Sequence, residues 1–248
     1  MIDLHSHVLP GLDDGAADVE EALAICRAAA ADGIEVLAAT PHVRAHDYPT
    51  TAEQMEEAYA TLSAAADGIL RLVPGGELDL EELRRPVEEL RRFALAGNPR
   101  YLLVETPYLG WPLDIGDRFF ELRASGITPV LAHPERNADV QQQPQLLEPL
   151  VATGTLVQVT AGSVDGRLGR RAQACAEALL TRELVHLVAS DGHAPSVRAI
   201  GMRAAADAIG DAELAHWLTV DLPRAIVDDT RLPPRPEVSR KKKRFGLF

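Results

Sequence analysis

The chain has 248 residues, of which 46% are hydrophobic and 25% are charged. This composition is typical of a globular domain, and no apolar run approaches the roughly 20 residues that a membrane-spanning helix needs. The net charge of −12 is uneven, because the five basic residues at 240–244 leave −17 on the rest of the chain, and so acidic a body argues against a general nucleic-acid binder. We expect a cytoplasmic protein, since the start has neither a positive leader nor an apolar signal core.

Short apolar runs alternate with longer runs rich in alanine and charge, and this alternation predicts strands and helices in turn. We expect strands at 2–6, 34–39, 69–73, 101–105, 127–132, 155–160 and 185–189. We expect helices at 18–32, 51–66, 79–96, 114–125, 144–153, 167–182 and 196–209. Seven βα units predict a parallel sheet, and their regular repetition favours closure into an α/β barrel of the TIM type over an open doubly wound sheet.

The composition changes at Arg231, where Leu-Pro-Pro-Arg-Pro begins. Such a segment suits an extended linker rather than a packed element. We therefore expect one domain over 1–230, followed over 231–248 by a Pro-rich linker and a basic, disordered tail. The two cysteines, Cys26 and Cys175, lie in predicted helices and build no disulfide framework.

Histidines and acidic residues gather where the predicted strands end. His5 and His7 are two apart at the end of the first strand, so their side chains share a face and both imidazoles can reach one ion. In βα folds the carboxyl ends of the strands form the active site, so ligand-type residues there are expected to converge. The nine candidates are His5, His7, Asp14, His42, Glu77, Glu105, His133, Asp191 and His193.

Nine ligand-type groups exceed what one ion needs and suit two or three bridged ions. Imidazole mixed with carboxylate favours Mn, Fe, Zn or Co over Mg. Several of these residues also have a structural interpretation. Asp14 and Asp191 could be turn or cap residues, and His42 or His133 could be a hydrogen-bonded residue near the core. Glu77 could be a surface charge, and Glu105 a paired buried carboxylate. The coincidence of all nine favours a metal site. His46 is close enough to His42 in sequence to approach the site, but we do not expect it to be a ligand, and His186 and His216 are expected to be structural.

Residue types that are missing from the predicted site exclude several classes of reaction. All three lysines lie at 241–243, so no strand supplies a bridging lysine carbamate, a Schiff-base lysine or a P-loop lysine, and neither cysteine begins a Cys-x5-Arg phosphatase motif. Arg136 follows His133, and Arg198 lies in the first turn of the helix expected over 196–209. Guanidinium groups match phosphoryl oxygens, so both arginines are candidates for binding a phosphoester, with surface arginines as the alternative.

The motifs resemble those of the PHP (polymerase and histidinol phosphatase) superfamily, and within it the bacterial protein-tyrosine phosphatases of the CpsB/YwqE/CapC type. The resemblance runs to about residue 225 and rests on MIDLHSHVLPGLDDGA, ATPHV, GGEL, AHPER and SDGH, in that order. It implies a distorted seven-stranded barrel and three metal ions, usually manganese or iron, held by the nine residues named above. It also implies that Arg136 and Arg198 hold the substrate phosphate.

The resulting hypothesis is metal-dependent hydrolysis of protein phosphotyrosine, with hydroxide held by the ions as nucleophile and with His42 or a metal-bound water as proton donor. The resemblance implies a substrate in the tyrosine-rich tail of a membrane-attached kinase that drives capsular or exopolysaccharide synthesis. Residues 240–248 combine basic charge with apolar anchors and suit weak contact with an anionic membrane surface, although a solubilising end explains them equally well. Alternatives are a small-molecule phosphatase such as histidinol-phosphate phosphatase, a nuclease, and a non-catalytic module stabilised by metal.

Overall fold

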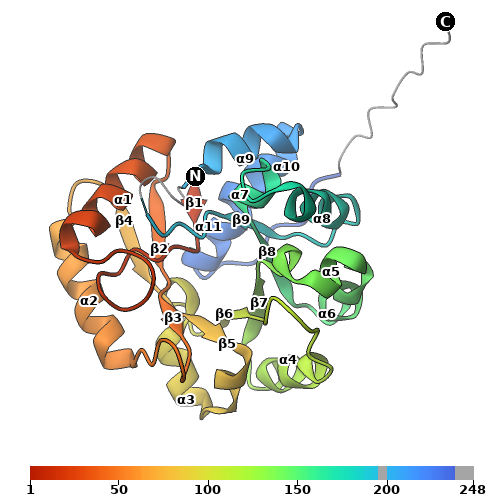
Figure 1. The fold of residues 1–248 in the computed structure, drawn as a ribbon, viewed down its shortest axis with the longest axis horizontal. Coiled ribbons are helices and arrows are strands. Elements are labelled where there is room, and N and C mark those ends of the chain that lie inside the picture. Colours follow the sequence, from red (N-terminus) through yellow and green to blue (C-terminus); the bar gives the residue numbers. More distant parts are fainter. Residues whose placement is uncertain (195–199, 238–248) are drawn as a thin grey trace, which may run out of the picture.

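The structure is a computed structural model that describes residues 1–194 and 200–237. Its strands are β1 Ile2–Asp3, β2 Val36–Ala39, β3 His42–Val43, β4 Arg71–Pro74, β5 Glu77–Asp79, β6 Tyr101–Glu105, β7 Thr128–Ala132, β8 Leu156–Thr160 and β9 Leu187–Ala189. Its α-helices are α1 Val19–Asp32, α2 Ala52–Ala65, α3 Val87–Leu90, α4 Ile115–Ala124, α5 Ala138–Gln142, α6 Glu148–Ala152, α7 Ala161–Val164, α8 Arg170–Thr181, α9 Met202–Ile209, α10 Ala212–His216 and α11 Leu222–Val227. The helices lie around the outside of the strands (Figure 1).

The paired strands are all parallel and form two sheets, in the orders β1-β2-β4 and β3-β5-β6-β7-β8-β9. Each sheet contains part of the same two chain segments, because β2 runs into β3 across Thr40 and Pro41, and β4 runs into β5 across Gly75 and Gly76. Proline cannot donate a ladder hydrogen bond, and adjacent glycines bend easily, which explains why both segments break at these points. The predicted parallel α/β organisation is therefore confirmed.

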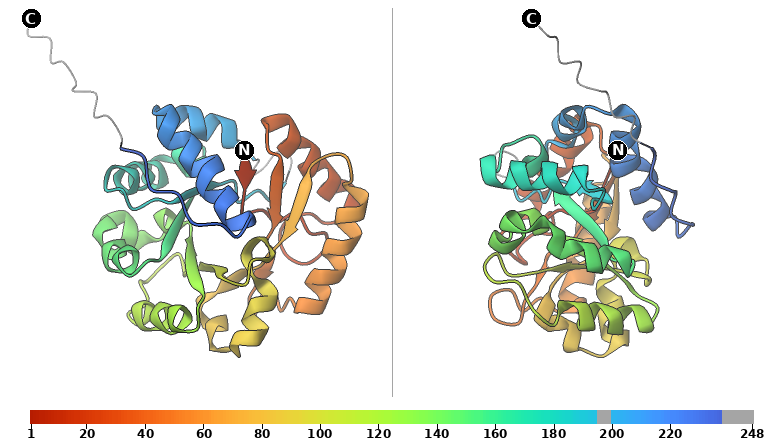
Figure 2. Two further views of the ribbon diagram at one scale, coloured as in Figure 1. Left: turned by 180° about the vertical axis from the view of Figure 1, so that it is seen from behind. Right: turned by 90° about the vertical axis from the view of Figure 1, so that its right-hand side faces the viewer.

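The outer strand β1 of one sheet and the outer strand β9 of the other lead into segments that contact each other. The backbone N–H of Asp191 donates to the carbonyl of His5 at 2.9 Å, and that of His7 donates to Gly192 at 2.8 Å. Ser6 and Gly192 form an isolated parallel bridge. The segment after β1 thus lies beside the segment after β9, and the N-terminus lies in the upper half of the molecule in both views of Figure 2.

Local sequence explains the longest helices. Asp18 caps α1 by accepting a hydrogen bond from the Glu21 N–H, and Thr51 forms a reciprocal capping box with Gln54 at the start of α2. The apolar faces of the helices pack against the strands in one hydrophobic core. Among the described residues, no helix is both long enough and apolar enough to cross a membrane.

Several predicted elements differ from those observed. The helix expected over 79–96 is wrong: 3₁₀ turns at Leu80–Arg84, Arg91–Phe93 and Leu95–Gly97 surround the four-residue α3. Pro86 explains the break, because a proline disfavours helical backbone at the preceding residue, and Arg85 is extended with ψ 157°. The strand expected over 2–6 pairs as β1 only at its first residues, and 144–153 divides into a 3₁₀ turn and α6.

The C-terminal part was underpredicted. Helices α10 and α11 were not expected, and the helix expected over 196–209 begins, within the described residues, at Met202. Residues 231–237 have no regular secondary structure but contact the domain, since Trp217 Nε1 donates to the Pro233 carbonyl at 3.2 Å and Arg235 donates to the Val185 carbonyl at 2.6 Å. The basic tail at 240–244 lies outside the described residues.

Candidate metal centre

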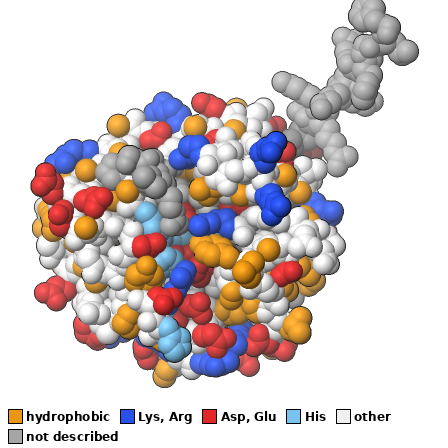
Figure 3. Space-filling view, in the orientation of Figure 1, with side chains coloured by type: hydrophobic (Ala, Val, Ile, Leu, Met, Phe, Trp, Pro, Cys, Tyr) orange, Lys and Arg blue, Asp and Glu red, His pale blue; other side chains and the backbone are white. Residues whose placement is uncertain are grey.

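The nine predicted ligand side chains lie together at the carboxyl ends of the strands. They fall into four overlapping groups whose potential ligand atoms lie within 4.8 Å of one another. All are buried except Asp14, whose side chain is 44% exposed. In the orientation of Figure 3, histidine, acidic and basic side chains are visible beside one another in the middle of this face.

The innermost side chains are those of His5, His7, Glu77 and Asp191, which come from two of these groups that share His5. The Nε2 atoms of His5 and His7 are 3.2 Å apart. Asp191 Oδ1 lies 3.5 Å from His5 Nε2 and 3.2 Å from His7 Nε2, and Glu77 Oε2 lies 3.3 and 3.4 Å from the same two atoms. The two imidazoles of one strand end therefore lie within 3.5 Å of carboxylate oxygens from two other strand ends.

Glu77 joins this group to the next one. Its Oε2 lies 2.9 Å from His42 Nδ1, which is also 3.2 Å from Glu105 Oε1. The parallel register explains this contact, because His42 on β3 is paired with Glu77 on β5. On the other side, His133 Nε2 lies 2.7 Å from Glu77 Oε1. A single glutamate thus connects imidazoles from three strand ends.

The outer group is nearer to solvent. Asp14 Oδ1 lies 3.3 Å from His193 Nε2 and 3.6 Å from His42 Nε2. The His193 and His7 rings are stacked with centroids 3.8 Å apart, so His7 contacts both the inner and the outer group. The loop after β1 carries Asp14, and the loop after β9 carries His193, and these are the two segments joined by the Ser6–Gly192 bridge.

Two residues that sequence reasoning missed orient the imidazoles. Asp13 Oδ2 lies 2.7 Å from His7 Nδ1 and accepts the His42 backbone N–H at 2.8 Å. Gln158 Oε1, on β8, lies 2.9 Å from His5 Nδ1. Hydrogen bonds of this kind fix the tautomer and the ring orientation of a ligating histidine. Asp13 was overlooked beside Asp14, and a buried glutamine inside an apolar strand was the signal for Gln158.

Two arginines contact acidic ligand candidates. Arg136 Nη1 donates to Asp191 Oδ2 at 2.5 Å, and its guanidinium lies over the Tyr108 ring, 4.8 Å from the centroid. Arg44, which was not predicted, donates through Nε to Glu105 Oε1 at 2.6 Å. Arg136 therefore lies at the edge of the centre. Arg198 lies outside the described residues.

Mutual contacts shift the pKa values of the buried groups. Burial alone would raise the pKa of Glu77, but His5 and His42 hold it well below its usual range. Burial opposes a charge on His7, yet Asp13 raises the pKa of His7 well above its ordinary value. The imidazoles thus stabilise the anionic form of the Glu77 carboxylate, and a bound cation would stabilise that form in the same way.

Two candidate ligands have unusual backbone conformations. His133 has φ 33° and Asp191 has φ 52°, which are left-handed values that side-chain-bearing residues rarely adopt. Each comes directly after or near the end of a strand, and each turns its side chain toward the centre. Strain of this kind is typical of functional sites.

The donor set fits divalent cations. Glu77 Oε2 is buried and, over residues 1–194 and 200–237, accepts no hydrogen bond, although imidazole nitrogens of His5, His7 and His42 lie 2.9–3.4 Å away. A carboxylate oxygen surrounded by imidazole nitrogens in this way can bind the same metal ion as those nitrogens. Imidazole and carboxylate ligands together are those of Mn, Fe, Co and Zn sites.

The remaining histidines lie outside these four groups. His46 is exposed, and His216 pairs with Asp221 at 3.3 Å. His186 accepts the Val157 backbone N–H through Nδ1 at 3.1 Å. Cys26 and Cys175 are buried free thiols in α1 and α8.

Comparison with known proteins shows which family the chain belongs to. Residues 1–221 match the family model described as capsular polysaccharide synthesis, CpsB/CapC. The chain belongs to the CpsB/CapC family. It is 33% identical to the tyrosine-protein phosphatase YwqE of Bacillus subtilis (strain 168), with all of both chains covered. It is 29% identical to the tyrosine-protein phosphatase CpsB of Streptococcus pneumoniae, covering 92% of this chain and 99% of CpsB.

A solved structure shows the same fold. It comes from crystal structures of Bacillus subtilis YwqE and Streptococcus pneumoniae CpsB, described as unique metal-dependent tyrosine phosphatases. The match has a TM-score of 0.84 at 29% identity and covers 96% of this chain and 100% of the other. The fold is thus shared along nearly the whole chain.

Proposed function

We propose that this CpsB/CapC protein hydrolyses phosphotyrosine in proteins with the help of divalent metal ions. The observation that carries the proposal is the convergence of four overlapping ligand groups at the strand ends, with Arg136 beside them. The names of the relatives support the same activity, since YwqE and CpsB are both tyrosine-protein phosphatases.

The nine converging residues are proposed as the ligands of two or three ions, with manganese first and iron, zinc or cobalt as alternatives. When bound, such ions would lower the pKa of water and offset the charge of the phosphoryl oxygens. His42 is proposed as a ligand rather than as the proton donor, because Nδ1 faces Glu77 and Glu105 while Nε2 faces Asp14.

Arg136 is proposed to hold the transferred phosphoryl group. The Asp191 carboxylate and the Tyr108 ring fix its guanidinium, so its remaining N–H groups are preorganised at the edge of the centre. Arg198 retains the same proposed role from sequence. Phenolate has a pKa near 10 and leaves more readily than an alkoxide, so a tyrosine ester needs less help from a general acid than a serine ester does.

The wider setting is also proposed. A natural substrate would be a bacterial tyrosine kinase that controls polysaccharide synthesis. The protein described here would act on it in the cytoplasm or at the inner surface of the membrane. We further propose that the two sheets act as one distorted seven-unit barrel, which the shared segments β2–β3 and β4–β5 and the Ser6–Gly192 bridge support.

The test combines metal removal with a substitution. Protein stripped by a chelator is assayed on a phosphotyrosyl peptide and on histidinol phosphate, before and after addition of Mn²⁺, Fe²⁺, Zn²⁺ or Co²⁺. We expect recovery with at least one ion and a preference for the peptide. Arg136→Ala should lower kcat by roughly 100-fold or more, the usual effect of losing a donor to transition-state charge.

Arg170→Ala is the matched control, because Arg170 is exposed at the start of α8. It should retain the wild-type rate. The proposal is refuted if no ion restores hydrolysis of the peptide, and the role of Arg136 is refuted if its variant retains the wild-type rate. A preference for histidinol phosphate would instead support a small-molecule phosphatase.

A further inference from the structure

A groove leads away from the candidate metal centre between α5 and α8. Its inner hollow is lined by Tyr108, Arg136, Gln141, Leu168 and Arg171. A second hollow shares Gln141 and Arg171 with the first and continues outward over the small side chains of both helices. Because they share these lining residues, the two hollows adjoin, and we call them together the α5–α8 groove, which begins at Arg136.

The charge of this groove differs from that of the rest of the protein. The chain has 37 acidic residues, yet no Asp or Glu lines either hollow. Arg171 is exposed and, within the described ranges, has no hydrogen bond or ion pair. An isolated cation in an acidic protein is available to an anion from outside.

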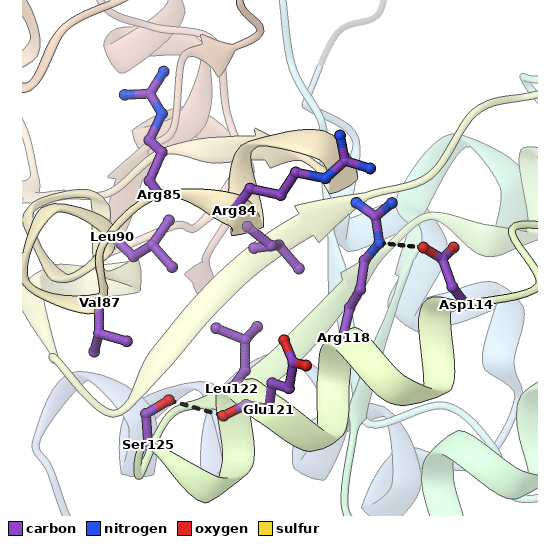
Figure 4. Close-up of a pocket in the computed structure, with 10 residues that line it drawn as sticks. Arg84, Arg85, Val87, Leu90, Asp114, Arg118, Glu121, Leu122 and Ser125 are labelled. Carbon is purple, nitrogen blue, oxygen red and sulfur yellow. Dashed lines mark hydrogen bonds and ion pairs between the residues drawn. The ribbon is translucent and has the colours of Figure 1, made fainter.

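A second arginine-lined hollow, between the 3₁₀ turn at Leu80–Arg84 and α4, shows the contrast (Figure 4). There Arg84 pairs with Glu81 at 2.8 Å, Arg85 with Glu89 at 2.7 Å and Arg118 with Asp114 at 2.7 Å. Each of these guanidinium groups is thus already paired with a carboxylate of the same chain. Arg171 is not, so the α5–α8 groove is the better site for an anionic ligand.

The inner end of the groove is also apolar. The Tyr108 side chain, which packs against the Arg136 guanidinium, and that of Leu168 are exposed by 41% and 36% respectively. Exposed apolar side chains beside a reaction centre suit contact with a polypeptide substrate. A chain segment leaving the centre past these residues would bring its next side chains to Arg171.

We propose that the α5–α8 groove binds the polypeptide on one side of the phosphotyrosine, and that Arg171 selects substrates with an anionic side chain there. The anion is a carboxylate or a second phosphate, since a guanidinium matches both. This inference rests on the proposed function and adds the substrate class. An extended segment advances about 3.3–3.6 Å per residue, so the anion should lie within a few positions of the phosphotyrosine.

The experiment uses the full chain loaded with metal and a set of phosphotyrosyl peptides. One peptide has neutral flanks, others carry a single glutamate at one of the nearest four positions on either side, and a final set replaces that glutamate by a second phosphotyrosine. The wild type should prefer glutamate at one or two positions on one side by about three- to fivefold in kcat/KM, within the range of an exposed ion pair. The preference should arise mainly from KM.

Two charge reversals identify the cation. Arg171→Glu should abolish or invert the preference, whereas Arg170→Glu, which changes net charge equally but lies outside both hollows, should keep it. The same peptides with a non-hydrolysable phosphotyrosine analogue are titrated by fluorescence anisotropy, so that binding is measured without turnover. Preference for the second phosphate over glutamate would identify phosphate as the anion.

The outcomes separate this inference from the proposed function. If no peptide is hydrolysed but the anion-dependent binding is present and is lost only in Arg171→Glu, the subsite stands and the phosphatase proposal fails. The subsite is overturned if the wild type shows no anion preference in either assay. It is also overturned if both charge reversals reduce the preference equally.

Discussion

Asp13 is a sensitive point of the candidate centre, because two candidate ligands depend on one carboxylate. Its Oδ2 binds His7 Nδ1 at 2.7 Å and the His42 N–H at 2.8 Å, while its Oδ1 accepts the Gly15 N–H at 2.9 Å. In Asp13→Asn, an amide NH₂ replaces one of these oxygens and must face a donor whichever way it turns. At least one bond is lost and the charge next to His7 disappears.

The expected result follows from the role of such contacts in metal sites. Loss of a partner that orients a ligating histidine typically weakens metal affinity about 10- to 100-fold, which is about 1.4–2.7 kcal/mol. Mn²⁺ would be titrated into metal-free wild type and Asp13→Asn in competition with a fluorescent chelator. Circular dichroism would check that the variant remains folded.

Asp18→Asn is the matched control, because Asp18 accepts the Glu21 N–H at the start of α1 and contacts no candidate ligand. Its Mn²⁺ affinity should stay within about twofold of the wild type, as expected for a helix cap that asparagine can replace. Equal affinity of the wild type and Asp13→Asn would refute the reasoning. An equal loss in both variants would do the same.

Two further predictions concern stability and packing. Burial, with a contribution from Arg235, lowers the pKa of His186 to about 4. The pKa in the unfolded chain is about 6.5, so protonation of His186 favours the unfolded state. The contribution of neutral His186 to folding stability is therefore complete above about pH 6.5 and is lost as pH falls toward 4. In urea unfolding, the free energy of unfolding of the wild type should therefore fall by about 2 kcal/mol more than that of His186→Gln between pH 7 and pH 5. Parallel profiles of unfolding free energy against pH would contradict this. In Gly15→Ala, the new Cβ would lie 1.9 Å from the His7 carbonyl oxygen, so we expect loss of bound metal by elemental analysis, whereas Gly116→Ala, with nothing within 4 Å, should bind metal normally. Normal metal content in Gly15→Ala would show that the loop adapts.

The sequence was most informative where physical rules act locally. The parallel α/β organisation follows from alternating strands and helices. Residues after successive parallel strands must meet at one edge, which is why the nine candidates lie together. Proline was given too little weight: Pro86 breaks the helix expected over 79–96. Helices α10 and α11 were missed because their short helical runs lie next to a proline-rich segment and follow no predicted strand.

Residues that orient the ligands were harder to predict. Asp13 and Asp14 are adjacent acids in one loop, and only the backbone path decides that Asp13 binds the far side of His7 while Asp14 faces His193. Gln158 points toward His5 from a strand distant in sequence, so its partner depends on the order of strands around the molecule. Such contacts arise from tertiary geometry, and a single sequence carries little trace of them.

The left-handed conformations of His133 and Asp191 have a consequence for how such a protein can evolve. A non-glycine residue held there costs roughly 1–3 kcal/mol, a sizeable part of the stability of a typical domain. Glycine at either position would relieve that cost while deleting a chemical group from the centre. Selection for heat resistance alone would therefore favour variants without these groups, and a protein that keeps both side chains exchanges some stability for ligand groups at the centre.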